Sequence, residues 1–379
     1  MKIKNVECIV LDGGKPYQLP KNSEEAVGVR YVCLLKVETD EGIIGWSDIE
    51  TQPHVAHAAV NAPISGSECF EGLKNIVVGE DPFDVEKLWN KIYKGTIYYG
   101  RRGVAIQVLS GFDIACWDIM GKATGKPIYK LLGGAYRNKV RAYASTLFRS
   151  KPEDMKTACH EYIDQGFTAV KFGYPENGRE LNVDLVAAAR EVLGDRVDLL
   201  IDLSWMGYNR SPYDAITLCK KLEPYNIYFL EDFLHPENYE GYAKVSKKVN
   251  IRIAAGEHEA TPWGFKDLIE RGKVDIIQPD LSRCGGFTAF RKIVWMAELN
   301  NVDIIPHAWL TNILTAASLH ANASLQKSHF LEYNVSSNPM LNEIVKNPIC
   351  MKDGFLNVRE KPGLGIEIDE KAIEKYRVL

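Results

Sequence analysis

The sequence lacks the features that would place it in a membrane or in an oxidising compartment. Its eight cysteines are scattered and form no C-x-x-C pair, which indicates reduced thiols packed in a core. The apolar stretches are interpreted as too short for a membrane span, and residues 1–6 are not typical of a signal peptide. We therefore expect a cytoplasmic protein.

A surplus of basic residues is also absent. Lysine and arginine number 46 against 50 aspartates and glutamates, which gives a net charge of −4. No basic run or RNA-binding motif interrupts this balance, so a general nucleic-acid surface is excluded. We expect a small-molecule partner, with neither nucleic acid nor membrane as a second one.

What the chain does contain is a series of apolar runs that end on charged side chains. Each run has the length of a buried parallel strand, and successive ends lie about 23–29 residues apart. That interval fits one strand–loop–helix–loop unit, and a ring of such units is a (β/α) barrel with its site at the strand carboxyl ends. The run ends are Asp202, Glu231, Glu257, Asp280 and His307.

The length of 379 residues exceeds that of an average barrel of about 250 residues, so a second domain is expected. Residues 1–50 have the pattern of a β-meander interrupted by a Gly- and Pro-rich loop at 12–28, interpreted as a lid, and residues 51–133 look helical. The predicted organisation is an α+β capping domain over 1–135, an α/β barrel over 136–335, and a C-terminal segment over 336–379 that packs back on the capping domain.

Three carboxylates on adjacent predicted strands suggest a metal site. Two bare carboxylates about 4 Å apart repel by roughly 4 kcal/mol at an effective dielectric near 20, so Asp202, Glu231 and Glu257 together require protons or a cation. An all-oxygen ligand set suits Mg²⁺. A single acid at a strand end is more often a helix cap or salt bridge, and it is the succession of three that favours the metal.

A histidine and an aspartate end the next two runs. Asp280 beside His307 would fix the imidazole tautomer and raise its basicity, which makes a general base. The alternative is a core histidine with a satisfied partner, and the neighbouring acids favour the base.

Three further side chains are candidates for the same space. Lys171 ends the second predicted strand and could hold a substrate carboxylate or a developing oxyanion, although a solvent-exposed lysine is an equal alternative. Glu332 could hydrogen-bond an enolate oxygen if protonated, and alone it is more often structural. His258 would point away along a regular strand unless the loop turns it towards the site.

Taken together, these residues resemble the enolase superfamily, in its mandelate racemase subgroup. The resemblance runs nearly end to end and implies a modified (β/α)₇β TIM-like barrel with an N-terminal α+β capping domain. It also implies removal of a proton α to a carboxylate with Mg²⁺ present, and a homo-oligomer. The matching segments are residues 111–118, 121–127 and 131–134, the ligand motifs at 201–202, 230–232 and 256–257, the dyad motifs at 278–280 and 306–307, and residues 330–332 and 362–365.

Departures from the family pattern bear on the reaction. The racemases have Lys-x-Lys on the second strand, whereas this chain has Lys171-Phe172-Gly173 and so lacks a second base. Ser204 replaces the usual asparagine after the first ligand, and Asp232-Phe233 replaces the usual Glu-Pro. The run 256–259 resembles the rhamnonate dehydratase branch, which points to sugar acids.

The expected function is therefore dehydration of an aldonate or similar acid to a 2-keto-3-deoxy acid through an enediolate. His307 oriented by Asp280 would take the α-proton, and Lys171 and Glu332 would hold the enediolate together with Mg²⁺. His307 could return its proton to the β-hydroxyl in a syn elimination; otherwise a second acid is needed, for which His258 and Tyr174 are the candidates. The lid and the 50–63 segment, with His54 and His57, would set specificity. An epimerase, racemase or cycloisomerase and a non-catalytic acid-binding member are the alternatives.

Overall fold

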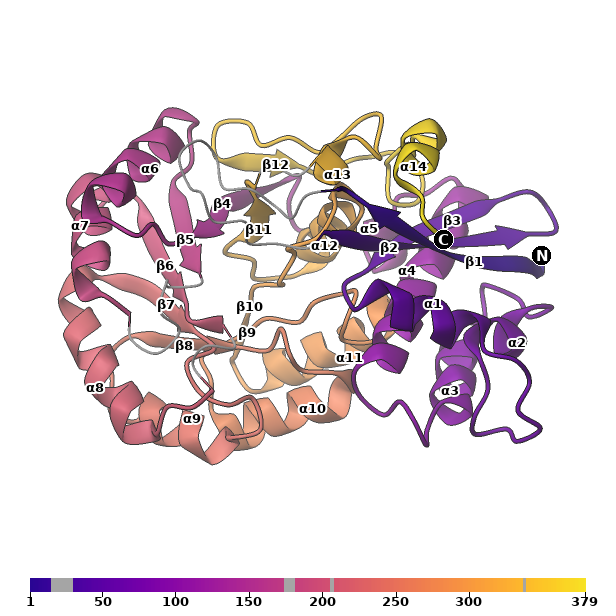
Figure 1. The fold of residues 1–379 in the computed structure, drawn as a ribbon, viewed down its shortest axis with the longest axis horizontal. Coiled ribbons are helices and arrows are strands. Elements are labelled where there is room, and N and C mark those ends of the chain that lie inside the picture. The colour runs from indigo at the N-terminus through magenta and orange to yellow at the C-terminus, as the bar shows by residue number, and fades with distance from the viewer. Residues whose placement is uncertain (15–29, 174–180, 205–207, 337–338) are drawn as a thin grey trace.

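The computed structural model describes residues 1–14, 30–173, 181–204, 208–336 and 339–379. Figure 1 shows two parts side by side, an antiparallel sheet with helices and a curled parallel sheet ringed by helices. This arrangement confirms the expected capped α/β barrel. The predicted lid at 12–28 and Tyr174 lie largely or wholly outside the described residues.

The capping part begins with a three-stranded antiparallel sheet in the order β1-β2-β3. Five helices follow it, and the longest, α4, begins after Gly103 and ends at Gly125, both with positive φ. A left-handed residue suits glycine, which has no Cβ to clash, so both ends of α4 are set by the sequence. The elements are β1 (Ile3–Asp12), β2 (Tyr31–Thr39), β3 (Ile44–Ile49), α1 (Pro53–Asn61), α2 (Leu73–Val77), α3 (Val85–Gly95), α4 (Val104–Thr124) and α5 (Ile128–Leu131).

Helix α4 corrects one expectation from the sequence. Its 21 residues are long and apolar enough to cross a membrane by length and composition, so the interpretation that every apolar stretch is too short was wrong. However, 89% of its most apolar window is buried inside the protein, between the capping sheet and α11. A helix that is apolar on all sides because it is buried on all sides is typical of a core helix.

The barrel part is a parallel sheet in the order β10-β9-β8-β7-β6-β5-β4-β11. Its eight strands alternate with seven helices, as a (β/α)₇β arrangement requires. The strands are β4 (Lys139–Leu147), β5 (Ala169–Gly173), β6 (Asp198–Asp202), β7 (Ile227–Glu231), β8 (Arg252–Ala255), β9 (Ile276–Ile277), β10 (Asp303–Ile304) and β11 (Leu331–Asn334).

The helices around this sheet fit the strand–loop–helix–loop interval found in the sequence. Helix α8, for example, begins with a capping box in which the Ser211 hydroxyl accepts from the Asp214 amide and Asp214 accepts from Ser211. The helices are α6 (Pro152–Asp164), α7 (Val183–Leu193), α8 (Pro212–Leu222), α9 (Tyr239–Ser246), α10 (Thr261–Asp267), α11 (Gly286–Leu299) and α12 (Asn312–Ser324), with short turns η2 (Glu223–Tyr225) and η3 (Leu268–Gly272).

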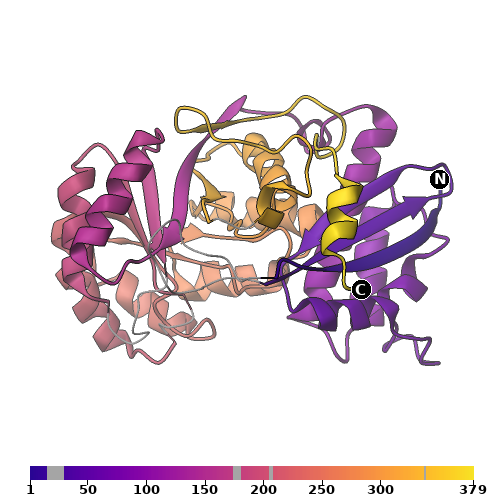
Figure 2. The same ribbon diagram turned by 45° about the horizontal axis from the view of Figure 1, so that its top comes forward.

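The C-terminal segment contacts both parts, as Figure 2 shows. Strand β12 (Phe355–Asn357) pairs antiparallel with β4, whereas α14 (Glu370–Tyr376) lies beside β1. Beyond α14, Leu379 exchanges backbone hydrogen bonds with Val10. A short helix, α13 (Pro339–Asn342), precedes β12 in the sequence. The domain boundaries at 135 and 335 stay a prediction.

Candidate active site

A layer of apolar side chains fills the inside of the parallel sheet, with one residue from each of six strands, one just beyond β10 and one just before β11. The layer is Tyr143, Ala169, Leu200, Phe229, Ala254, Ile276, Ile305 and Phe330, all buried. Side chains two residues apart on a strand point to the same face. The positions two residues further on therefore point into the same interior, and they are Ser145, Lys171, Asp202, Glu231, Gly256, Gln278, His307 and Glu332. The site is the polar layer above this apolar one.

The three predicted metal ligands meet in this layer. Asp202 and Glu231 are direct partners in the β6–β7 register, and one carboxylate oxygen from each of Asp202, Glu231 and Glu257 lies within 4.8 Å of the other two. Glu257 lies two residues past β8, after Gly256 with φ +137°. A Cβ on Gly256 would lie 2.9 Å from the Gln278 amide nitrogen, so only glycine allows the turn that returns Glu257 to the interior.

The side chain of Lys171 lies among these acids rather than in solvent. Its ammonium is 3.0 Å from Glu231, 3.0 Å from Glu332 and 3.3 Å from Asp202. Burial works against its charge, but these carboxylates outweigh burial and raise the pKa of Lys171. The lysine is therefore held charged at the centre of the polar layer.

The acids respond differently to the same surroundings. Burial raises the pKa of Asp202 and, together with the Asp202 charge, raises the pKa of Glu231 well above its usual range. Burial also acts on Glu257, but the imidazoles of His307 and His258 outweigh it and hold its pKa well below the usual range. Burial thus disfavours the anionic forms of two of the three acids even beside the Lys171 ammonium, and a metal cation shared among them would favour those forms.

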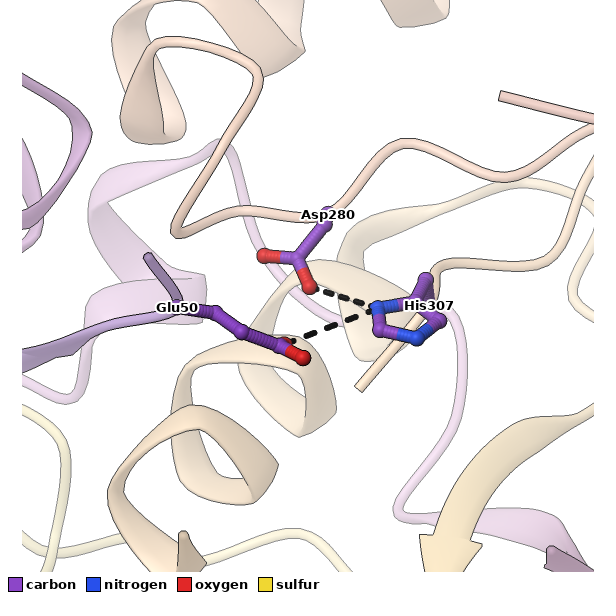
Figure 3. Close-up of side chains that lie close together, drawn as sticks. All are labelled: Glu50, Asp280 and His307. Carbon is purple, nitrogen blue, oxygen red and sulfur yellow. Dashed lines mark hydrogen bonds and ion pairs between the residues drawn. The ribbon is translucent and has the colours of Figure 1, made fainter. Parts of the chain in front are cut away.

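His307 and Asp280 form the predicted dyad, shown in Figure 3. The His307 Nδ1 is 2.6 Å from one carboxylate oxygen of Asp280. The other oxygen of Asp280 accepts hydrogen bonds from the Ser282 amide and hydroxyl. The opposite ring nitrogen, Nε2, is 3.1 Å from Glu257. Burial would lower the pKa of His307, but Glu257 and Glu332 outweigh it and raise the pKa to about 10. Because Nδ1 is bound to Asp280, Nε2 is the nitrogen that faces the pocket.

Glu332 belongs to the same polar layer and is held by two hydrogen bonds. Its two oxygens accept hydrogen bonds from the Ser145 hydroxyl and the Ala308 amide, each at 2.7 Å. Burial acts against ionisation, yet Lys171 and His307 keep the pKa of Glu332 below its usual value. An ionised Glu332 accepts hydrogen bonds and cannot donate one, which differs from the protonated form considered from the sequence.

The loop does turn His258 towards the acids. Its Nε2 lies 3.1 Å from Glu257, 3.3 Å from Asp232 and 3.0 Å from the Tyr208 hydroxyl. Burial acts against its charge, but Glu257 and Asp232 raise the pKa of His258. A partly exposed imidazole therefore stands next to the third ligand.

Two charged residues of the site were missed from the sequence. Glu50 directly follows β3 of the capping sheet, and Arg283 follows the Asp280 turn; their side chains are 2.5 Å apart. Glu50 lies within the 50–63 segment, but the residues singled out there were histidines. Most of that segment is α1, where the His54 ring packs on Tyr31. The sequence signal that could have identified Glu50 was a carboxylate directly after a predicted strand.

The space between these side chains is small. A pocket of about 30 Å³, near the volume of one water molecule, is lined by residues that include Lys171, Asp202, Glu257, His307 and Glu332. A ligand the size of a sugar acid would have to displace some of these side chains. A larger groove of about 690 Å³ lies on the outer surface beside α11 and carries none of this cluster.

The donor set fits a hard divalent cation. All three candidate ligands present carboxylate oxygens, and one oxygen of Glu231 is buried without a hydrogen-bond partner among the described residues. An unpaired buried carboxylate oxygen is costly unless a cation or donor satisfies it. The acids could therefore hold a divalent metal, with Ser204 orienting Asp202 through two hydrogen bonds to one oxygen, at 2.6 and 2.9 Å.

Comparison with known families matches nearly the whole chain. Residues 6–133 match the model of the mandelate racemase / muconate lactonizing enzyme N-terminal domain, and residues 154–372 match that of the enolase C-terminal domain-like family. The two matches correspond to the capping part and to the barrel part.

Three curated relatives cover most of the chain. The D-galactarolactone cycloisomerase of Agrobacterium fabrum is 34% identical over 91% of both chains. The arabinonate dehydratase of Saccharolobus solfataricus is 33% identical over 91% of this chain and 90% of its own. The D-galactonate dehydratase of Pectobacterium atrosepticum is 34% identical over 90% and 89%.

A solved structure gives the same picture. The 3,6-anhydro-D-galactonate cycloisomerase from Zobellia galactanivorans superposes with a TM-score of 0.88 over 100% of both chains, at 30% identity.

Proposed function

Because the chain belongs to the enolase superfamily, in its mandelate racemase subgroup, we propose that it is a Mg²⁺-dependent dehydratase of a sugar acid. One observation carries the proposal: the His307–Asp280 dyad faces three converging carboxylates across one pocket, with Lys171 between them. The named relatives include two sugar-acid dehydratases, which supports a carbon–oxygen lyase.

In this proposal the metal is held by Asp202, Glu231 and Glu257. A bound cation supplies positive charge beside the substrate carboxylate and so makes the neighbouring C–H more acidic.

The protein's own groups carry the proton transfers. His307, held by Asp280 through Nδ1, takes the α-proton at Nε2 in its neutral form, which a cation on Glu257 would favour by offsetting the charge that raises the pKa of His307. Lys171, itself anchored by Glu332, stabilises the negative charge of the enediolate. His258 donates a proton to the departing β-hydroxyl, and its contacts with Tyr208 and Glu257 hold the ring beside the third candidate ligand. Tautomerisation then gives the 2-keto-3-deoxy acid.

A cycloisomerase is the second candidate, favoured by the relative from Agrobacterium fabrum and by the Zobellia structure. It would use the same proton abstraction but expel a ring oxygen that stays attached, so no water is lost. Racemisation by two bases is disfavoured, because position 173, where the family's second lysine would stand, is a glycine next to Asp202.

A library of sugar acids, incubated with Mg²⁺ and separately with EDTA, tests the proposal. We expect metal-dependent formation of a 2-keto-3-deoxy acid from at least one aldonate, and His307→Asn should lower kcat by roughly 10²–10⁴-fold. Exchange of the α-proton in deuterated water without keto-acid formation would indicate the cycloisomerase instead. Full activity in the variant would contradict the assignment of the base.

We further propose that the enzyme acts in the cytoplasm as a homo-oligomer in carbohydrate catabolism, without nucleic-acid or membrane partners. Sedimentation or light scattering would check the oligomeric state.

A further inference from the structure

Glu50 reaches the dyad from the other domain. It follows the last strand of the capping sheet, is 9% exposed, and lines the pocket beside His307 (Figure 3). One carboxylate oxygen is 2.5 Å from Arg283, and the other is 3.8 Å from His307 Nδ1. This second oxygen is buried and has no hydrogen-bond partner among the residues that the structure describes.

The backbone of Glu50 is tied to the same group of residues. Its amide donates to the Ser282 hydroxyl at 3.3 Å, and that hydroxyl donates to Asp280 at 2.7 Å. Asp280 in turn holds His307. A chain of hydrogen bonds therefore runs from the capping sheet to the imidazole without passing through the metal ligands.

The same stretch of the capping sheet also holds the element that follows His307. Asp48, two residues before Glu50, accepts hydrogen bonds from the Thr311 hydroxyl at 2.5 Å and the Thr311 amide at 3.1 Å. Thr311 caps the start of α12, shortly after His307. Residues at the end of β3 thus form hydrogen bonds with both loops that carry the dyad.

Arg283 explains what the Glu50 carboxylate contributes. The guanidinium lies 2.5 Å from Glu50 but 3.9 Å from the Asp280 oxygen that binds His307. If Glu50 lost its charge, Asp280 and Glu257, each 3.9 Å from the guanidinium, would be the remaining carboxylate partners of Arg283, and Arg283 would compete with His307 for the Asp280 oxygen. The carboxylate therefore keeps the arginine away from the dyad.

From this geometry we infer that Glu50 is a positioning residue for the general base: it holds Arg283 off Asp280 and fixes the His307 ring from the capping domain. The inference rests on the proposed role of His307. Although Glu50 lines the pocket, its carboxylate faces Nδ1 of the ring, whereas Nε2 faces Glu257 and Glu332, so its expected role is to orient the base rather than to bind the substrate.

The test compares Glu50→Gln with Glu237→Gln. Glu237 forms another ion pair between the two parts, 2.6 Å from Arg102, but lies outside the dyad, so it controls for loss of interdomain charge. We expect Glu50→Gln to lower kcat by about 10–100-fold with KM changed by less than about threefold, as for other residues that orient a functional histidine. The control variant should keep wild-type values.

A second readout needs no turnover. The Nδ1–H proton between His307 and Asp280 should give a far-downfield proton NMR resonance, assigned by its loss in Asp280→Asn. Glu50→Gln should shift or broaden this resonance, and Glu237→Gln should leave it in place.

If Glu50→Gln does not fold, Ser282→Ala is the replacement variant, because it removes the hydroxyl between Glu50 and Asp280. Ser282→Ala should also lower kcat and move the resonance. A resonance unchanged in the folded variants would overturn the inference, even if no sugar acid is turned over. Absence of wild-type turnover with an altered resonance would instead count against the proposed function alone.

Discussion

At the scale of single residues, the site depends on side chains that orient the charged groups. Ser204 shows this clearly: it has a left-handed φ of +46°, uncommon outside glycine, and donates both its amide and its hydroxyl to Asp202. From the sequence it was only a departure from the family's asparagine. In the structure the shorter serine side chain orients the first candidate ligand, Asp202.

Replacing Ser204 with alanine should therefore weaken the metal site without unfolding the protein. Loss of one hydrogen bond to Asp202 is expected to lower Mg²⁺ affinity on the order of 10-fold, measured by calorimetric titration. Ser324→Ala, which removes a hydroxyl bond at the end of α12, is the matched control and should bind the metal as the wild type does. Equal affinity in both variants would mean that Ser204 does not orient the ligand.

At the scale of elements, the sequence could predict which apolar runs form strands and that their charged ends Asp202, Glu231 and His307 lie at one end of the sheet. The structure brings these residues together with Lys171, which the sequence left open between the site and solvent. On a regular strand side chains alternate by rule, so Lys171, Asp202 and Glu231 share one face of the sheet. The rule fails where a strand ends. β9 and β10 have only two paired residues each, and Glu257 reaches the site by a turn rather than by a strand.

That turn makes Gly256 a sensitive position. Alanine there would need φ near +137° and a Cβ 2.9 Å from the Gln278 amide, so Gly256→Ala should cost about 1–3 kcal/mol of stability and displace Glu257. Metal affinity should fall with it. Gly194→Ala, at a positive φ with open space around it, should cost stability but leave metal affinity unchanged. Urea unfolding and calorimetric titration separate the two effects.

At the scale of the whole molecule, contacts between the two parts were beyond sequence reasoning. Glu50 meets Ser282 across 232 residues, and no local pattern reports such a pairing. The same holds for Asp113 on α4, a buried carboxylate that accepts from the Thr288 amide of α11 at 3.0 Å. The sequence could therefore predict the architecture and the strand-borne half of the site, but not the half assembled between the parts.

Asp113 predicts how stability depends on pH. Burial raises its pKa to about 7, above the ordinary value of 3.8, so the folded state binds the proton more tightly than the unfolded state. Its contribution to stability should thus be greatest below about pH 4 and decline as pH rises to about 7, by up to about 1.4 kcal/mol per pH unit. Above that window the decline should stop.

Asp113→Asn removes this titration, so the variant should lose less stability than the wild type between pH 4.5 and pH 7. Urea unfolding at several pH values measures the difference, and Asp84→Asn, at the exposed carboxylate that precedes α3, controls for the change in net charge. Parallel curves for wild type and Asp113→Asn would contradict the prediction.

The pairing of residues 377–379 with β1 has a consequence for synthesis. Arg377 and Glu7 form an ion pair across 370 positions, and Leu379 bonds to Val10 beside it. Strand β1 is synthesised 370 positions before the neighbour that pairs with it at Glu7 and Val10. Until that neighbour has been made, this edge of the capping sheet is open to pairing with other chains.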